Sequence, residues 1–285
     1  MNSIIINLPY AGCGAPAALI NRLGLTGDEL RLENWRLADP LLAEIVREAA
    51  TFEDQSQLLE RPVVVNAWSP LVADPLGILE IERQKSSQRL ARPKPAVLPE
   101  STAGRLIELS PADQDIVLKR AAIPFLQTLE EKVKLALESR PLVLVLTCRS
   151  YFSRPQGYEK SQKYPRPHAC VTADPTLTPE ALSNLAGNIL RAFGWWPELN
   201  WPHEIAAPLP DALQNRGRVV PIGLSFSRDL YMDEKTGRRK PRAEAVARIL
   251  RTMLNLFDQE LSRVAARRIE RFNKPRRLSP IIKAG

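Results

Sequence analysis

Short runs of apolar residues alternate along the chain with longer segments in which apolar residues recur every three or four positions. The short runs are rich in Val, Ile and Leu and end in loop-forming residues, which is typical of buried β-strands. They cover residues 4–8, 62–67, 142–148 and 218–226. The run at 142–148 is the clearest central strand, because its apolar residues suit a sheet that is covered on both faces.

The longer segments have the period of amphipathic helices. They cover about residues 38–50, 110–139, 178–193 and 242–271. Asp39 and Thr178 stand where N-caps are expected, and each is followed by a proline in the first turn. Pro124 falls inside the second helix and should kink or interrupt it, because its nitrogen has no hydrogen to donate.

This alternation of strands and helices predicts one α/β domain of three layers, in which helices flank a mixed, mostly parallel sheet. We expect the domain to cover residues 1–272 and to be followed by a basic C-terminal tail, residues 273–285. Residues 84–104 are polar, basic and rich in proline, so a long loop is expected there.

Composition indicates the class of protein and the cellular compartment in which we expect it. The chain has 285 residues, of which 44% are hydrophobic and 25% charged, as in globular proteins. No apolar stretch approaches the roughly 20 residues that span a bilayer, and the N-terminus lacks the pattern of a signal peptide. Three scattered cysteines do not suggest a disulfide framework, so we expect a reduced, cytoplasmic protein.

Positive charge is concentrated near the C-terminus. Residues 235–285 hold 15 Lys and Arg but only 4 Asp and Glu, whereas the whole chain has a net charge of +8. Such a segment either forms a solvated helix face or meets an acidic partner. Because no RNA- or DNA-binding motif accompanies the cations, a protein partner or self-association is favoured over nucleic acid.

Two local features have both a functional and a structural interpretation. Cys148 adjoins Arg149, whose charge would favour a thiolate nucleophile, but a small buried strand residue is the simpler interpretation. Trp195, Trp196 and Trp201 lie in a proline-rich cluster. We expect Trp195 to be buried and Trp196 or Trp201 to be partly exposed, as an anchor for a partner.

Four segments carry an ordered set of motifs. The first strand leads into Pro9-Tyr10-Ala11-Gly12, and residues 63–77 and 142–150 each join a strand to a polar loop. Residues 221–237 contain the unusual string Leu230-Tyr231-Met232-Asp233-Glu234. In order and spacing these segments, across roughly residues 1–260, resemble the N-formylglutamate amidohydrolase family. The resemblance implies the fold of zinc-dependent exopeptidases and amidohydrolases.

The resemblance also implies a zinc site made of two histidines and an acidic residue, with a glutamate as general base. In this sequence Tyr10 and Arg149 stand at the two histidine positions, and Ser225 stands at the glutamate position. Arginine stays protonated and does not ligate metals. A serine hydroxyl has no pKa near neutrality with which to act as a base.

Other positions of the family pattern differ too. Thr147 replaces an aspartate, and Pro70 and Gly77 align with the two arginines that bind the substrate carboxylate. The acidic ligand should fall within residues 32–39, where Glu33 or Asp39 is available.

The sequence therefore favours a pseudoenzyme, which is a non-catalytic relative that acts as a binding, scaffold or partner subunit and holds no cofactor. Its former active-site pocket would accept an acidic or peptide-like ligand. The residues expected to line this pocket are Tyr10, Asp74, Arg149, Ser225 and Arg228.

The alternative is an active amidohydrolase that cleaves an N-acyl amino acid or a peptide-like amide with a rearranged zinc site. The chain has only two histidines, both in loops rich in proline. The candidate zinc ligands of this alternative are His168, His203 and Glu204.

Overall fold

The structure is a computed structural model, and it describes most of the chain. The described residues are 3–15, 17–54, 57–72, 74–76, 79, 101–102, 110–159, 161–203, 209–210, 213 and 217–273. The predicted loop at 84–104, apart from residues 101–102, lies outside this range, as do Pro16, Gly77, Glu204 and the tail beyond Asn273. The division of the chain at residue 272 stays a prediction.

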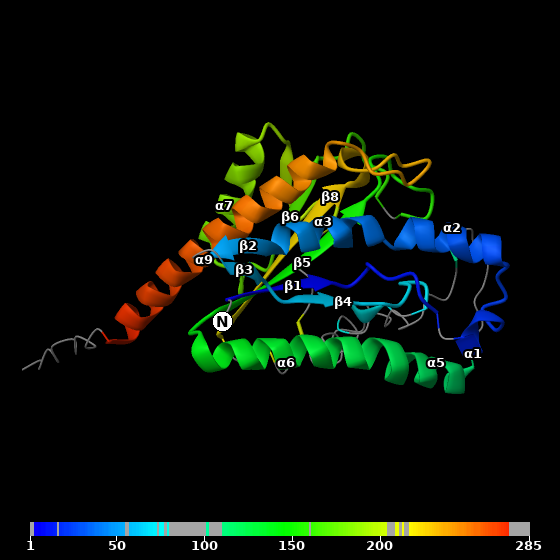
Figure 1. Cartoon of the computed structure of the whole chain (residues 1–285), viewed down its shortest axis with the longest axis horizontal. Helices are drawn as coiled ribbons and strands as arrows, with labels where there is room; N and C mark the ends of the chain where they lie inside the picture. The colour runs from blue at the N-terminus through cyan, green and yellow to red at the C-terminus, as the bar shows by residue number, and fades with distance from the viewer. Residues whose placement is uncertain are drawn as a thin grey trace, which may run out of the picture.

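A six-stranded sheet forms the centre of the domain, in the order β4-β1-β5-β8-β6-β7 (Figure 1). Its strands are β1 (Ile4–Leu8), β4 (Val63–Val65), β5 (Val143–Tyr151), β6 (Ala169–Ala173), β7 (Pro197–Leu199) and β8 (Val219–Ser227). β4, β1, β5 and β8 run parallel, whereas β6 pairs antiparallel with β8 and parallel with β7. The predicted mixed, mostly parallel sheet is confirmed, and the four predicted strands are its parallel ones.

The apolar pattern does not predict the last two strands in the sheet order, β6 and the edge strand β7. It also does not predict the antiparallel hairpin of β2 (Thr51–Asp54) and β3 (Gln57–Glu60), which lies outside the main sheet.

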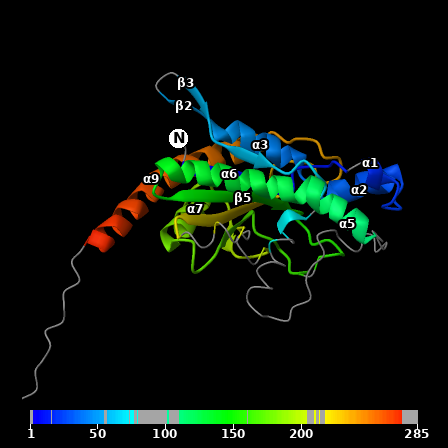
Figure 2. The same ribbon diagram turned by 90° about the horizontal axis from the view of Figure 1, so that it is seen from below.

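Helices cover both faces of the sheet (Figures 1 and 2). The long helices are α3 (Pro40–Ala50), α6 (Ile123–Ser139), α7 (Glu180–Ala192) and α9 (Ala243–Asn273). Because side chains alternate along a strand, Ile4 and Ile6 of β1 pack in the core with α3, α7 and α9. Ile5 packs in a second core beneath α6. The expected three-layer α/β architecture is confirmed.

The predicted stripe on the last helix is buried in the first of these cores. Its members are Val246, Ile249, Leu250, Met253, Phe257, Leu261 and Val264. The end of α9, drawn in red, extends beyond the sheet (Figures 1 and 2). Within the described chain no helix is both long and apolar enough to cross a membrane.

The predicted helix at 110–139 is interrupted just before Pro124. It consists of α5 (Pro111–Val117), a π-helical turn (Leu118–Ala122) and α6. Within the π turn the N–H of Ile123 bonds to the carbonyl of Leu118, five residues back. This wider turn leads the chain into Pro124, which cannot donate a helical hydrogen bond.

The two predicted N-caps have different outcomes. The Asp39 carboxylate accepts a hydrogen bond of 2.8 Å from the N–H of Leu42, so its cap is confirmed. The predicted cap by Thr178 is wrong, because α7 begins after Pro179 without a side-chain cap. The Thr178 hydroxyl instead accepts from the N–H of Asp174 (3.0 Å) and donates to the carbonyl of Pro221 in β8 (2.5 Å).

Two further helices extend one end of the domain. α1 (Ala17–Ile20) and α2 (Gly27–Leu37) follow the loop after β1, and α2 begins with a capping box between Thr26 and Glu29. Leu19 and Leu23 pack with Leu71 and with Val117 of α5 in a third core.

The loops that follow β1 and β4 are held against each other. The N–H of Gly14 bonds to the carbonyl of Ala67 (3.1 Å), and the N–H of Ser69 bonds to the carbonyl of Gly14 (2.8 Å). The side chain of Asn66 donates to the carbonyl of Pro9 (2.9 Å). A Cβ added at Gly12 would lie 2.1 Å from the Ala67 carbonyl carbon, so only glycine fits this approach.

We expect Gly12→Ala to lower the free energy of unfolding by about 1–3 kcal/mol, because the added methyl group collides with backbone rather than with a movable side chain. Urea unfolding followed by circular dichroism measures the change. Gly157→Ala is the matched control, because nothing lies within 4 Å of its added Cβ. Equal effects of the two substitutions would contradict the close approach of the loops.

Candidate functional site

Strand register places three polar side chains side by side at one end of the sheet. Arg149 of β5 pairs with Ser225 of β8, and Ser225 pairs in turn with Cys170 of β6. Side chains of directly paired residues point to the same face of a sheet. The predicted residues Arg149 and Ser225 are therefore neighbours, and Cys170 joins them without having been predicted.

Tyr10 reaches the site from the loop after β1. Its hydroxyl donates a hydrogen bond of 2.9 Å to a carboxylate oxygen of Asp74, which also accepts from the N–H of Leu76 (3.1 Å). Burial raises the pKa of Tyr10 well above its ordinary value, and Asp74 raises it further, while Arg149 acts in the opposite direction. Tyr10 is therefore a neutral donor.

Arg149 is the positive charge of the site. Burial lowers the pKa of its guanidinium, whereas Tyr10, Cys170 and Asp74 act to raise it. The structure thus brings together Tyr10, Asp74, Arg149 and Ser225, four of the five residues expected to line the pocket. Because an arginine side chain stays protonated at neutral pH, the site carries a fixed cation beside one carboxylate.

His203 enters the site from a loop. Its Nδ1 lies 2.9 Å from the Ser225 hydroxyl, its ring packs edge-on against Tyr151 with 5.7 Å between centroids, and its carbonyl accepts from the Cys170 thiol at 3.6 Å. Burial lowers the pKa of His203 well below 6.5, and the charges of Arg149 and Arg166 lower it further. The imidazole is therefore neutral at physiological pH.

The other two candidate zinc ligands are placed differently. Nδ1 of His168 accepts a hydrogen bond of 2.9 Å from the N–H of Trp196, so His168 links the beginnings of β6 and β7. Glu204 lies outside the described residues. A zinc site from His168, His203 and Glu204 stays a prediction.

The donor chemistry of the site does not fit zinc. Catalytic zinc is held by imidazole, thiolate or carboxylate groups, usually three of them. Among the described residues, no group of three or more His, Cys, Asp or Glu side chains lies close enough together to hold a metal ion. The groups around Ser225 are instead the cation of Arg149, the thiol of Cys170 and a single imidazole.

Cys148 of β5 points into the first core, away from this cluster. Its side chain is 2% exposed, and burial raises the pKa of its thiol to about 12. The thiol therefore stays protonated at neutral pH, and the structural interpretation of Cys148 is confirmed.

Arg228, the fifth expected pocket residue, holds the framework behind the site. Its three nitrogens donate to the carbonyls of Trp35 (2.7 Å) and Ala38 (3.0 Å) and to the hydroxyl of Ser150 (3.0 Å). It also lies 3.6 Å from the carboxylate of Asp39. Arg228 thus connects the end of α2 and the start of α3 to β5, and its contact with a ligand stays a prediction.

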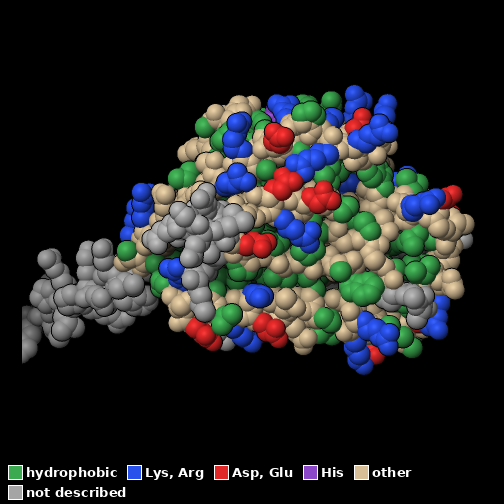
Figure 3. Space-filling view, in the orientation of Figure 1, with side chains coloured by type: hydrophobic (Ala, Val, Ile, Leu, Met, Phe, Trp, Pro, Cys, Tyr) green, Lys and Arg blue, Asp and Glu red, His purple; other side chains and the backbone are tan. Residues whose placement is uncertain are grey.

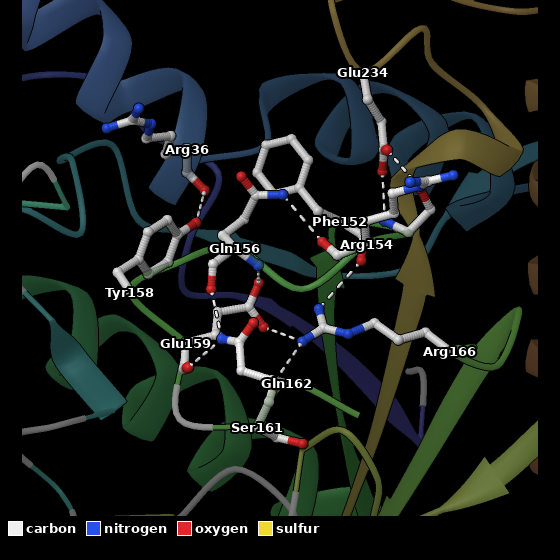
Figure 4. Close-up of polar contacts among 11 residues, drawn as sticks. Arg36, Phe152, Arg154, Gln156, Tyr158, Glu159, Ser161, Gln162, Arg166 and Glu234 are labelled. Atoms are coloured by element: carbon white, nitrogen blue, oxygen red, sulfur yellow. Dashed lines mark hydrogen bonds and ion pairs between the residues drawn. The ribbon is translucent and has the colours of Figure 1, made fainter. Parts of the chain in front are cut away.

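The string Leu230–Glu234 is also part of this framework. The Tyr231 hydroxyl donates to the Asp39 carboxylate that faces Arg228, and Asp233 accepts from the N–H groups of Lys235 and Thr236, both at 2.9 Å. Glu234 accepts from the N–H and the hydroxyl of Ser153, both at 2.6 Å. Figure 4 shows Glu234 reaching the loop that follows β5.

The described parts of that loop, residues 152–159 and 161–168, are held by several side-chain contacts that the sequence does not predict. Arg166, only 7% exposed, forms an ion pair with Glu159 and donates to the carbonyls of Phe152 (3.2 Å) and Ser161 (3.3 Å). Gln162 donates to the carbonyls of Gln156 (2.9 Å) and Glu159 (2.7 Å) (Figure 4). The only local sign in the sequence that Arg166 holds this loop is its position between Pro165 and Pro167.

The solved structures that are similar to this one include two that cover nearly the whole chain. The N-formylglutamate amidohydrolase from Ralstonia eutropha JMP134 has a TM-score of 0.70 at 17% identity, with 92% of this chain and 94% of that chain covered. The gene product Atu2144 from Agrobacterium tumefaciens has a TM-score of 0.60 at 15% identity, with 94% and 92% covered. No family model and no curated protein matches the sequence. The fold that the sequence resemblance implies is therefore confirmed.

We expect Arg228→Met to lower the free energy of unfolding by about 3–5 kcal/mol, because it leaves the buried carboxylate of Asp39 without its cation. Urea unfolding provides the measurement. Arg238→Met is the control, since Arg238 is exposed, and it should change stability by less than about 0.5 kcal/mol. A small effect at Arg228 would show that its contacts do not hold the framework.

We expect the imidazole of His203 to stay neutral in the folded protein at pH values where a free imidazole, with a pKa of about 6.5, is half protonated. The unfolded chain binds this proton and the folded chain does not, so His203 reduces stability progressively as pH falls below about 6.5. NMR of the two histidine rings between about pH 5 and 8, assigned with His203→Gln, tests this.

Arg149→Met should raise the pKa of His203 only in part, because burial is its larger cause and remains. An imidazole of His203 that titrates at its ordinary pKa in the unaltered protein would contradict the buried contact with Ser225.

Proposed function

We propose that this chain is a non-catalytic protein with the N-formylglutamate amidohydrolase fold that acts as a binding or partner subunit. The observation that carries the proposal is Arg149 at the end of β5, where it lies with Tyr10 and Asp74 and pairs in register with Ser225. A fixed cation at this point repels a metal ion and supplies no lone pair to one.

The same residues suit recognition of an acidic or peptide-like ligand. A guanidinium binds carboxylates through paired hydrogen bonds, and burial strengthens such contacts relative to water. The neutral imidazole of His203 and the hydroxyl of Ser225 add groups that donate or accept a hydrogen bond without adding charge.

The intact framework supports a retained pocket. Arg228, Tyr231 and Glu234 hold α2, α3 and the loop after β5 in place through contacts that involve no metal and no reacting group. A chain that has lost catalysis still needs these contacts in order to fold. The framework is therefore compatible with a protein that binds without cleaving.

The second candidate is an amidohydrolase that cleaves an N-acyl amino acid or peptide-like amide with rearranged zinc ligands. It is favoured by one observation, which is that His203 does reach the site. Against it, Nδ1 of His168 accepts a hydrogen bond from the N–H of Trp196, so in the neutral imidazole Nε2 carries the proton and offers no lone pair to a metal.

We expect the untagged, gently purified protein to contain no stoichiometric zinc and to show no hydrolysis of N-formyl-L-glutamate, because the site lacks the ligands and the base. Metal mass spectrometry and a formate-release assay measure the two properties. The Ralstonia eutropha amidohydrolase, purified and assayed in parallel, is the positive control.

About one zinc per chain, lost in His203→Ala, would instead establish the rearranged site. Hydrolysis that depends on that zinc would end the proposal of a non-catalytic protein.

A further inference from the structure

An exposed patch of cations and aromatic rings lies on the loop after β5 and on the segment after β7. The guanidinium of Arg154 lies 5.6 Å from the ring centroid of Tyr164, and the ammonium of Lys163 lies 4.6 Å from the ring centroid of Trp201. Lys163 and Tyr164 are adjacent in sequence, so the two pairs are neighbours along the chain. We name these four residues, Arg154, Lys163, Tyr164 and Trp201, the Arg154–Trp201 patch.

The patch is accessible and electropositive. Tyr164 is 60% exposed, both cations are exposed, and Trp201 is half-buried as expected from the sequence. Neither Arg154 nor Lys163 forms an ion pair within the described part of the chain. The loop's own carboxylate, Glu159, is instead bound to Arg166, so it does not neutralise the patch.

The patch is also held in place before any partner binds. Glu234 binds Ser153, next to Arg154, and the ion pair of Arg166 with Glu159 fixes the loop on either side of Lys163 (Figure 4). A surface that is already ordered loses little conformational entropy on binding. Exposed, rigid aromatic rings beside cations are typical of protein docking sites.

We propose that the Arg154–Trp201 patch docks a short, extended and acidic segment of a partner protein. Carboxylates of that segment would meet Arg154 and Lys163, and its apolar atoms would lie on the exposed ring of Tyr164. The proposal deepens the proposed binding function and rests on it, since it names the chemistry of one partner.

Two other occupants fit less well. A nucleic acid gains affinity mainly from a long row of cations along its phosphates, whereas this patch offers two, Arg154 and Lys163. Addition of a strand to the edge of β7 is hindered, because Pro197 has no N–H to donate.

The patch borders the candidate site. Trp201 is two residues from His203, which contacts Ser225. An acidic segment that docks on the patch would therefore extend toward Arg149. The charge of Arg149 is positive, like the charges of Arg154 and Lys163.

The test uses the full chain and a fluorescently labelled hexaglutamate peptide as the probe. Fluorescence anisotropy would be measured at about 50 mM salt and again at about 300 mM, because exposed charge pairs are screened by salt. We expect saturable binding at low salt. The double charge reversal Arg154→Glu with Lys163→Glu should weaken it by about tenfold or more.

A matched control separates the patch from general electrostatics. Arg120→Glu with Lys132→Glu makes the same change of net charge at two exposed positions of the α5–α6 segment. This control should bind hexaglutamate within about twofold of the unaltered protein. Circular dichroism establishes that all variants fold.

Three outcomes would overturn the proposal. They are no saturable binding of hexaglutamate, equal losses in the two double variants, and tighter binding of a single-stranded oligothymidylate that the patch variant abolishes. Zinc content and hydrolysis are measured separately, so a failure here is distinguishable from a failure of the proposed function.

Discussion

The buried guanidinium of Arg228 is the contact on which the arrangement of the site depends. A charge with 3% of its surface exposed is tolerated only because the carbonyls of Trp35 and Ala38, the hydroxyl of Ser150 and the nearby carboxylate of Asp39 surround it. These partners come from the end of α2, the N-cap of α3 and β5, and β5 is far from the two helices in the sequence. The hydrogen bonds and the ion pair of Arg228 therefore fix the relative positions of these three elements around the end of the sheet.

The second cation of the region, Arg149, has a different setting. Its neighbours are Tyr10, Asp74 and Cys170, and burial lowers the pKa of its guanidinium while these three neighbours act to raise it. Burial lowers the pKa of His203 most, and the charge of Arg149 lowers it further, so that imidazole stays neutral. Under the proposed function, the cation of Arg149 would select a ligand by charge, and the Asp74 carboxylate and the neutral hydrogen-bonding groups would orient that ligand without a metal.

The sequence predicts correctly those features that neighbouring residues determine. It does not predict those that depend on a partner far away in the sequence. β5 and the Asp39 cap of α3 are predicted correctly, because apolar runs and capping chemistry are local. The Thr178 cap is wrong because its hydroxyl bonds to Pro221 of β8, a partner that no local pattern shows. Within the site, the resemblance anticipates Tyr10, Arg149 and Ser225 as positions, but not the contact of His203 with Ser225, which a proline-rich loop makes across 22 residues.

The string Leu230–Glu234 has a consequence for how related sequences are interpreted. Leu230, Tyr231 and Met232 are buried, and Asp233 and Glu234 cap a turn and a loop. A substitution that removes these contacts would lower the stability of the folded chain, whatever the chain binds or cleaves. The requirement for a folded chain alone is enough to explain such a string, with or without a reaction. The string therefore indicates which fold a chain adopts. The side chains at the strand ends indicate which chemistry the chain can perform.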